Sequence, residues 1–292
     1  MRVLVTGATG YVGHAVAVAL AEVGHEVAAL TRDSGSGRAR ALEDFGVLPL
    51  RGRLADRALL SGMLVGVDAV VHTAFDPDDP VGADRALFAA LAAAGGRRHL
   101  VYTTGCSVYG EHAHAMLTPQ TPVDNGNVRA RLEAELRGAG LPHTVLRPAM
   151  VHGGDARSSI VGDWFREAAS TGPVHRGRRD KVWSWIHVED LARAYVALLR
   201  APGDHEGCTY LLADAHPATP LAVVEAAARV AGNSDAVAFA PIENEKPVYR
   251  VFDRDEVIDS SVARAALGWT PQESDVLAAL PPSFERWSAA RP

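Results

Sequence analysis

The sequence predicts an α/β fold, a doubly wound parallel sheet with a smaller C-terminal substrate lobe. Three observations predict it. A glycine-rich turn at residues 6–13 lies between the apolar run 3–5 and a helix-like stretch at 14–23. Short apolar runs then alternate with amphipathic stretches through the first half. The alternation ends after Arg147-Pro148, where scattered short elements follow.

The residue pattern of the first half predicts its helices, strands and loops. The strongest mid-chain helices are residues 83–94 and 127–137, and Gly138-Ala139-Gly140 stops the second. Gly35-Ser36-Gly37 predicts an exposed loop. We assign residues 1–150 to a dinucleotide-binding domain and residues 151–292 mainly to the substrate-binding lobe. The predicted strands are residues 3–5, 27–30, 47–50, 69–72, 100–103 and 144–146.

Composition excludes several kinds of partner. A chain of 292 residues with 48% apolar residues can bury one large core, or a core plus a smaller lobe. A net charge of -6 provides no basic stripe for nucleic acid, so a small-molecule substrate is favoured. Cys106 and Cys208 are too few for a disulfide framework, which favours a reducing cytoplasm. Charged residues soon interrupt the first apolar segment, so we expect neither a secretory signal nor a membrane span.

The glycine turn predicts a nucleotide site. Glycines allow a tight turn and a close approach of the backbone to a pyrophosphate, whose charge is stabilised by the amides at the start of the following helix. The second predicted strand follows about one βα unit later, which is the context that such a turn requires. A glycine turn without a ligand is the alternative. The residues expected to hold the pyrophosphate are Gly7, Thr9, Gly10, Tyr11, Val12 and Gly13.

Motifs along nearly the whole chain resemble the extended or atypical short-chain dehydrogenases/reductases. This group includes nucleotide-sugar epimerases, dehydratases, and flavonoid or steroid reductases. The motifs are Thr6 to Gly13, Val70-Val71-His72-Thr73-Ala74, Ser107-Val108-Tyr109-Gly110, residues 147–153, residues 185–192 and Leu267-Gly268-Trp269-Thr270-Pro271.

The resemblance implies a Rossmann fold to which residues 181–213 return. It also implies a homodimer formed through the helices at 83–94 and 127–137. It places Thr73, Ala74 and Phe75 beside the adenosine and nicotinamide riboses, and Pro148, Met150 and Val151 beside the nicotinamide.

The end of the second predicted strand favours NADP(H) over NAD(H). An acidic residue there would accept the hydroxyls of the adenosine ribose, but this chain has Thr31 followed by Arg32. A guanidinium there would pair with a 2′-phosphate, the alternative being a solvated arginine. Relatives commonly carry an aspartate that contacts adenine where this chain has Arg53, beside Leu54. Arg53 would stack on the base or face water.

The catalytic residues depart from the family pattern. Relatives use Tyr-x-x-x-Lys, in which the lysine lowers the pKa of the phenol. Our alignment puts Asn127 in the tyrosine position and Arg131 in the position of the ribose-binding lysine. An arginine can still hold a ribose there, but asparagine provides no titrating proton. The catalytic serine aligns with Gly105, which leaves Thr104 as the nearest hydroxyl.

Two explanations remain open. In the first, hydride transfer persists and the proton comes from Thr104, Tyr109, His152 or water. In the second, the pocket has lost redox turnover and serves an NADP(H) sensor or regulator, or an isomerase, cyclase or epimerase. His112 and His114 are expected to be exposed loop residues rather than part of a metal site, and we predict no metal.

We expect an NADP(H)-dependent oxidoreductase that acts on a carbonyl, an alcohol or a double bond of a small metabolite, in keeping with secondary metabolism. A fairly complete C-terminal lobe favours catalysis. Asp190 is expected to cap a helix at 191–199. The aromatic residues that line a substrate cleft or pack the core are Trp164, Phe165, Trp183, Trp185 and Tyr249.

Overall fold

A computed structural model describes residues 1–76, 78–111, 116–156, 158–242, 252–273 and 275–290. The chain divides into two compact units. The first comprises residues 1–104, 123–147 and 192–210, and the second comprises residues 105–122, 148–191 and 211–292. His112, His114 and Tyr249 lie outside the described residues.

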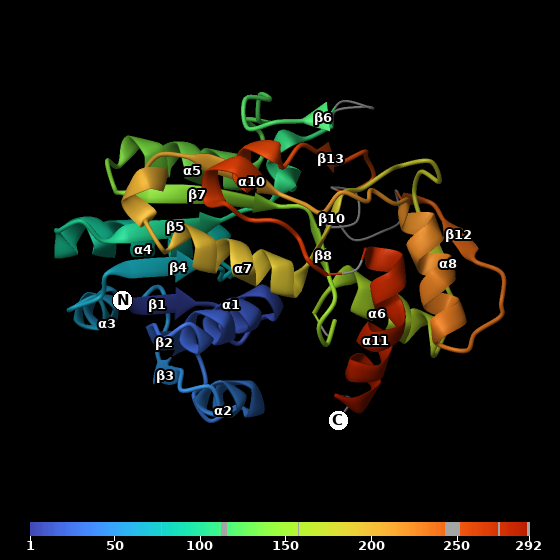
Figure 1. Ribbon diagram of the computed structural model, residues 1–292, viewed down its shortest axis with the longest axis horizontal. Coiled ribbons are helices and arrows are strands. Elements are labelled where there is room, and N and C mark those ends of the chain that lie inside the picture. Colours follow the sequence, from blue (N-terminus) through green and yellow to red (C-terminus); the bar gives the residue numbers. More distant parts are fainter. Residues whose placement is uncertain (77, 112–115, 157, 243–251, 274, 291–292) are drawn as a thin grey trace. The chain divides into compact units, whose positions relative to one another are not determined.

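A seven-stranded sheet organises the first unit, with the order β11-β7-β5-β4-β1-β2-β3 (Figure 1). The pairs β1–β2, β2–β3, β1–β4, β4–β5 and β5–β7 are all parallel, which confirms the predicted fold class. The strands are β1 (Arg2–Thr6), β2 (Glu26–Thr31), β3 (Leu48–Arg51), β4 (Ala69–His72), β5 (His99–Thr103), β7 (His143–Pro148) and β11 (Thr209–Leu212).

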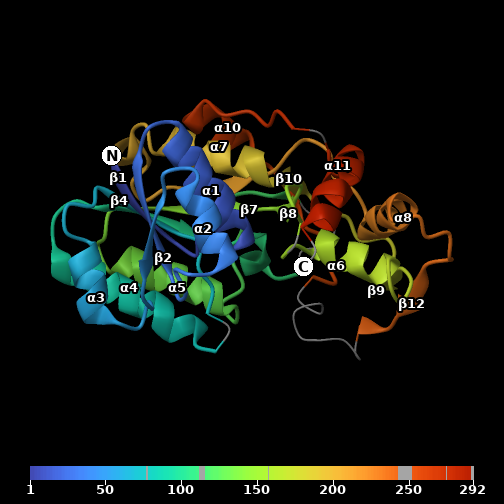
Figure 2. The same cartoon turned by 90° about the horizontal axis from the view of Figure 1, so that it is seen from below.

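Helices cover both faces of this sheet, with α1 and α2 on one face and α3, α4 and α5 on the other (Figure 2). The helices are α1 (Tyr11–Glu22), α2 (Gly37–Glu43), α3 (Arg57–Met63), α4 (Pro80–Ala94), α5 (Val128–Gly138) and α7 (Val188–Leu198), together with the 3-10 turn η2 (Pro202–His205). The helices α3, α4 and α5 share an apolar core with the strands, which includes Leu4, Val70, Leu100, Leu132 and Val145.

Short polar side chains set the helix starts. The side chains of Ser36, Asp56, Asp79 and Asn127 each accept a backbone N–H in the first turn of the helix that follows. The prediction that residues 35–37 form a loop was wrong at its last residue, because Ser36 starts α2 at Gly37. Helix α4 begins three residues earlier than predicted, at Pro80, whose missing N–H costs nothing at that position.

The second unit packs its helices around an aromatic core. Trp164, Phe165, Trp183 and Trp185 are all buried there, and the Trp164 and Trp183 rings stack with centroids 6.3 Å apart. These residues therefore pack the core, while Trp164 and Trp183 also border a hollow of about 20 Å³, the size of a single water. The elements are η1 (Cys106–Tyr109), β6 (Met116–Leu117), β8 (Met150–His152), α6 (Ile160–Ala168), β9 (Val174–Arg176), β10 (Trp185–His187), α8 (Pro220–Val230), β12 (Ala238–Ala240), β13 (Val257–Ile258), α10 (Ser261–Leu267) and α11 (Val276–Ala289).

Asp190 does not cap the helix that was expected at residues 191–199. It lies inside the first turn of α7, and its carboxylate accepts the backbone N–H groups of Gln272 at 2.7 Å and Glu273 at 3.0 Å. The side chain therefore fixes the loop before α11 rather than its own helix. Among the described residues, no helix is long and apolar enough to cross a membrane.

Candidate functional site

The strand order reverses between β1 and β4, so a crevice opens outside their carboxyl ends. The glycine turn lies at this edge. Gly7 has a φ of +79°, and a Cβ built on it would lie 2.6 Å from the backbone N of Ala74. A Cβ on Gly13 would lie 2.2 Å from the Gly7 carbonyl oxygen and 2.5 Å from Oγ1 of Thr73. Only glycine fits either position.

The start of α1 is suited to an anion. Its N-cap is Gly10, so no side chain caps the helix. Helix α1 is 12 residues long, and its N-terminal dipole points out of the turn. The glycine turn and this helix start together fit the pyrophosphate of a dinucleotide, with Thr9, Tyr11 and Val12 supplying the intervening backbone.

Arginines surround the adjacent strand ends. Thr31 is buried at the end of β2, whereas Arg32 is exposed. Arg38, on α2, donates a hydrogen bond from Nη1 to the carbonyl oxygen of Thr9 at 2.8 Å and so contacts the glycine turn itself. Arg53 is exposed, and Leu54 packs partly buried against the core.

The loop after β4 is tied to β1. The hydroxyl of Thr73 donates to the carbonyl oxygen of Thr6 at 2.8 Å, and Ala74 contacts the glycine turn. Phe75 is 58% exposed, and the guanidinium carbon of Arg129 lies 5.1 Å from the centre of its ring. This is the geometry of a cation–π contact.

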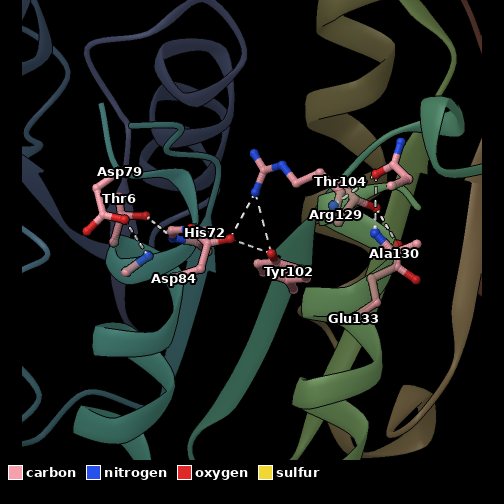
Figure 3. A network of polar contacts seen from close by, with 11 residues as sticks. Thr6, His72, Asp79, Asp84, Tyr102, Thr104, Arg129, Ala130 and Glu133 are labelled. Carbon is pink, nitrogen blue, oxygen red and sulfur yellow. Dashed lines mark hydrogen bonds and ion pairs between the residues drawn. The ribbon is translucent and has the colours of Figure 1, made fainter. Parts of the chain in front are cut away.

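A buried polar network lies behind this loop (Figure 3). The ring of His72 places Nδ1 2.7 Å from Oγ1 of Thr6 and Nε2 3.1 Å from Oδ1 of Asp84. The other carboxylate oxygen of Asp84 accepts a hydrogen bond from the hydroxyl of Tyr102 and one from Nη1 of Arg129 at 2.9 Å. The network links β1, β4, α4, β5 and α5.

The charges in this network are compensated. Burial alone would raise the pKa of Asp84, but the hydrogen bond from His72 and the charges around the carboxylate lower that pKa below its usual value. Burial, followed by the charge of Asp84, raises the pKa of Tyr102. Asp84 is therefore an ionised acceptor and Tyr102 a neutral donor.

The hydroxyl of Thr104 already has an acceptor. It donates to Oε1 of Glu133 at 2.7 Å. Glu133 also accepts two hydrogen bonds from the buried Arg147, from Nε at 3.0 Å and from Nη2, and a further one from Arg137 at 3.0 Å. Nothing in the sequence singled out Glu133, because only the fold brings Thr104 and Arg147, which are 29 and 14 residues away, to its carboxylate.

Asn127 and Arg131 lie at the start of helix α5. The Oδ1 atom of Asn127 accepts the backbone N–H of Arg129 at 2.9 Å, so this side chain is the N-cap of the helix. Arg131 is exposed, whereas Arg129 faces the buried network. The expected role of Arg131 in holding a ribose stays a prediction, and Arg129 is the arginine on this helix with a built environment.

In the second unit, His152 and Asp214 form a buried pair. Nε2 of His152 lies 3.8 Å from Oδ2 of Asp214, and their side chains are 1% and 6% exposed. Neither ring nitrogen of His152 has a hydrogen-bond partner among the described residues. The ring of His187 lies 5.2 Å away, and burial, followed by the charge of His152, lowers the pKa of His187 to about 4.

The other candidate residues of this unit are engaged in packing or hydrogen bonds. The hydroxyl of Tyr109 donates to the carbonyl oxygen of Thr118 at 2.8 Å. Pro148 is buried at the end of β7, and Met150 and Val151 are half-buried on β8. The structure does not test their expected place beside a nicotinamide.

His187, Glu189 and Glu273 bring one possible ligand atom each within 4.8 Å of the others. The Nδ1 atom of His187, however, accepts the backbone N–H of Glu189 at 3.3 Å. Its Nε2 atom packs against Gly153, where an added Cβ would lie 2.1 Å away. The ring is therefore held by the protein on both nitrogen-bearing sides.

The sequence is similar to those of several known reductases and epimerases. A reductase of Streptomyces griseus, named (4-alkanoyl-5-oxo-2,5-dihydrofuran-3-yl)methyl phosphate reductase, is 33% identical over 230 residues, covering 79% of this chain and 74% of that protein. A UDP-glucose 4-epimerase of Streptomyces lividans is 28% identical over 340 residues, covering 100% and 97%. A 3-diazoavenalumate denitrifying reductase of Streptomyces sp. is 32% identical over 240 residues, covering 73% and 76%.

A solved structure confirms the epimerase/dehydratase-like fold that the motifs implied. The UDP-glucose 4-epimerase of Bifidobacterium longum, in complex with NAD⁺ and UDP, superposes with a TM-score of 0.84 at 21% identity, covering 99% of this chain and 98% of that one. The model of the NmrA-like family matches residues 1–258. The chain therefore belongs to the NmrA-like family.

Proposed function

We propose that the protein is an NADP(H)-dependent oxidoreductase of atypical short-chain dehydrogenase/reductase type that reduces a carbonyl or a conjugated double bond of a small metabolite. The observation that carries the proposal is the glycine turn, in which a Cβ on Gly7 or Gly13 would overlap the backbone. A bound nicotinamide dinucleotide would supply the hydride. Residues of the chain bind it, orient it and deliver the proton.

The strand ends support NADP(H). Arg32 is exposed at the end of β2, where a guanidinium would reach a 2′-phosphate. The carboxylate of the next residue, Asp33, accepts the backbone N–H of Gly35 at 2.9 Å and so stabilises its own turn. Arg38 and Arg53 add positive charge on the neighbouring segments. Together these arginines favour a phosphorylated adenosine ribose.

The names of relatives support the substrate class. The Streptomyces griseus protein is named as a reductase of a dihydrofuranone that carries an alkanoyl group. Such a ring holds a carbon–carbon double bond conjugated to carbonyl groups. We propose an activated double bond or carbonyl of this kind as the substrate here.

We propose His152 as the proton donor. The hydroxyl protons of Thr104 and Tyr109 are both directed to acceptors within the protein. The ring of His152 has two nitrogens without a hydrogen-bond partner among the described residues, and Asp214 lies near enough to stabilise an imidazolium.

Nucleotide titration tests the cofactor. We expect NADPH, followed by its fluorescence, to bind at least about 10-fold more tightly than NADH, because a charged hydrogen bond contributes about 1.5–3 kcal/mol. Arg32→Ala should weaken NADPH about 10-fold and leave NADH unchanged. Arg200→Ala removes an exposed arginine two residues after α7 and serves as the control. Absence of binding by either nucleotide overturns the proposal.

A second candidate is an NADP(H) sensor without turnover. The engaged hydroxyls of Thr104 and Tyr109, and the asparagine that caps α5, favour it. A screen of enones and ketones for NADPH consumption separates the two functions. Turnover that falls about 100-fold in His152→Ala, with NADPH affinity kept, supports the reductase. NADPH binding without consumption of any compound supports the sensor.

A further inference from the structure

His152 is buried away from water, although the proposed reaction takes a proton from it. Its side chain is 1% exposed, and neither ring nitrogen has a hydrogen-bond partner within the part of the chain that the structure describes. Each turnover removes one proton from this ring. The ring must therefore be reloaded before the next turnover, and solvent does not reach it directly.

His187 lies directly beside His152. The two residues are partners in the register of the parallel strands β8 and β10, so their side chains leave the same face. The ring centroids are 5.2 Å apart and the rings are nearly perpendicular, with an interplanar angle of 85°. A ring nitrogen lies about 1.2 Å from its centroid, so two nitrogens turned toward each other would be about 3 Å apart, which is hydrogen-bond distance. A small rotation of either ring therefore permits proton transfer between them.

The ring of His187 extends from this pair toward the surface. Its Nδ1 accepts the backbone N–H of Glu189 at 3.3 Å, so the neutral ring carries its proton on Nε2. Nε2 is at the other end of the ring, against Gly153, the residue that follows His152. A Cβ on Gly153 would lie 2.1 Å from this nitrogen, so glycine permits the close packing. The proton of His187 therefore lies on the side of the ring that faces β8.

The outer end of His187 is close to two carboxylates. His187, Glu189 and Glu273 each bring one nitrogen or carboxylate oxygen within 4.8 Å of the others, and both glutamate side chains are exposed. Burial, followed by the charge of His152, lowers the pKa of His187 to about 4. His187 is therefore neutral between turnovers, and it can pass a proton inward without retaining it.

We infer that His187 reloads His152 with protons that enter from solvent at the carboxylates of Glu189 and Glu273. This inference rests on the proposed function. The proton on Nε2 of His187 passes to the ring of His152 as another proton enters from the surface at Nδ1 of His187. Exchange with solvent then returns His187 to its Nε2–H form, which the amide of Glu189 favours. One proton moves inward per turnover, and no electron moves.

A purely structural role of His187 predicts different kinetics. Loss of packing would slow every turnover, including the first. Loss of a proton route spares the first turnover, because His152 begins it protonated, and slows only the turnovers that follow. Loss of packing would also leave the exchange of the His152 ring proton with water unchanged or make it faster, whereas loss of the route makes this exchange slower.

Stopped-flow measurement of NADPH oxidation, with the enone that the screen identifies as a substrate, separates the two roles. In His187→Gln we expect a burst of one NADPH per protein molecule at the wild-type rate. Later turnovers should be about 10- to 100-fold slower, so that kcat falls while kcat/KM is unchanged. Free imidazole should restore part of the lost rate. A first turnover slowed as much as the later ones overturns the inference.

A second measurement needs neither nucleotide nor substrate. Nitrogen-edited NMR follows the exchange of the His152 ring proton with water, which we expect to be at least about 10-fold slower in His187→Gln than in wild type. His175→Gln is the matched control, because His175 is a buried histidine of the same unit whose Nε2 donates to the carbonyl oxygen of Arg178. It should show neither a burst nor slower exchange. Equal exchange in wild type and His187→Gln overturns the inference.

Glu189→Gln combined with Glu273→Gln guards against misfolding of His187→Gln, because both glutamate side chains are exposed. This variant should also show the burst, with later turnovers about 3-fold slower than in wild type. Wild-type protein that consumes no NADPH with any compound of the screen refutes the proposed function itself. Wild-type turnover with no burst in either variant refutes only this inference.

Discussion

Replacing Glu133 by glutamine tests how much a buried ion pair between α5 and β7 stabilises the fold. The side chain of Glu133 is 0% exposed and that of Arg147 is 2% exposed. Glutamine keeps the size of the side chain but replaces one carboxylate oxygen by an NH₂ group. That group would then face the N–H donors of Arg147 and Arg137, so donors would oppose donors.

The expected magnitude follows from the burial. Breaking a buried pair by removing one partner costs about 3–5 kcal/mol, because the other charge is left without compensation. Arg147 cannot reach water without displacing the core, whereas Arg137, whose side chain is 41% exposed, can. We therefore place the loss in the free energy of unfolding of Glu133→Gln within that range, and assign nearly all of it to Arg147.

Urea unfolding followed by circular dichroism measures this loss, with Glu135→Gln as the matched control. Glu135 lies on the same helix and pairs with Arg85 at the surface, where ion pairs contribute little. Combining Glu133→Leu with Arg147→Met should restore part of the stability, because both charges are then gone. A loss below about 1 kcal/mol in Glu133→Gln would refute the reasoning.

Three further predictions follow from buried groups and close contacts. Burial raises the pKa of Glu256 to about 7, so the folded state keeps a proton that the unfolded state releases near 4.5. Stability should therefore fall by about 3 kcal/mol as the pH rises from 4.5 through 7, and urea midpoints of Glu256→Gln should lack this slope. Burial lowers the pKa of His99 to about 4, so the stability that the neutral ring contributes above pH 6.5 is lost as the pH falls from 6.5 to 4. The stability of His99→Gln should depend less on pH in that window. Gly13→Ala should abolish NADPH binding and lower the melting temperature. Gly62→Ala, with nothing within 4 Å of its added Cβ, should raise the melting temperature. Equal changes in melting temperature in the two variants would contradict the close approach of the backbone at the turn.

The parts of the site that a local pattern defines could be predicted from the sequence. The glycine turn depends on residues within one βα unit, and the strand ends beside it follow from apolar runs. The structure confirms the expected strands and the helix stop after Gly138. Parallel winding then brings the ends of β1 and β4 to one edge without further information.

Pairs made across the fold could not be predicted in the same way. Asp84, Glu133 and Asp214 have no local signature, and each is identified by a partner that the topology brings to it. Asp190 shows the opposite case. Its place at a helix start predicted a cap, but the nearby amides of Gln272 and Glu273 compete for its carboxylate, and only the folded chain brings them there.

The difference between Arg129 and Arg131 shows how sensitive such an alignment is. Two residues along an α-helix turn the side chain by about 200°, so they lie on nearly opposite faces. The cap at Asn127 sets where the helix begins, and it turns Arg129 inward. A shift of two residues in such an alignment therefore moves the selected side chain between the buried face and the solvent face of α5.

Two buried ion pairs fix helix α5, one on each of two successive turns. The helix contributes the positive charge to the first pair and the negative charge to the second. Arg129 meets a carboxylate from α4, and Glu133, four residues later on the same face, meets the guanidinium of Arg147 from β7. Lysine could not replace Arg147, because Arg147 donates from two nitrogens to one carboxylate. Arginine therefore has a structural use at α5, because the buried pairs of Arg129 and Glu133 fix the rotation of the helix about its axis.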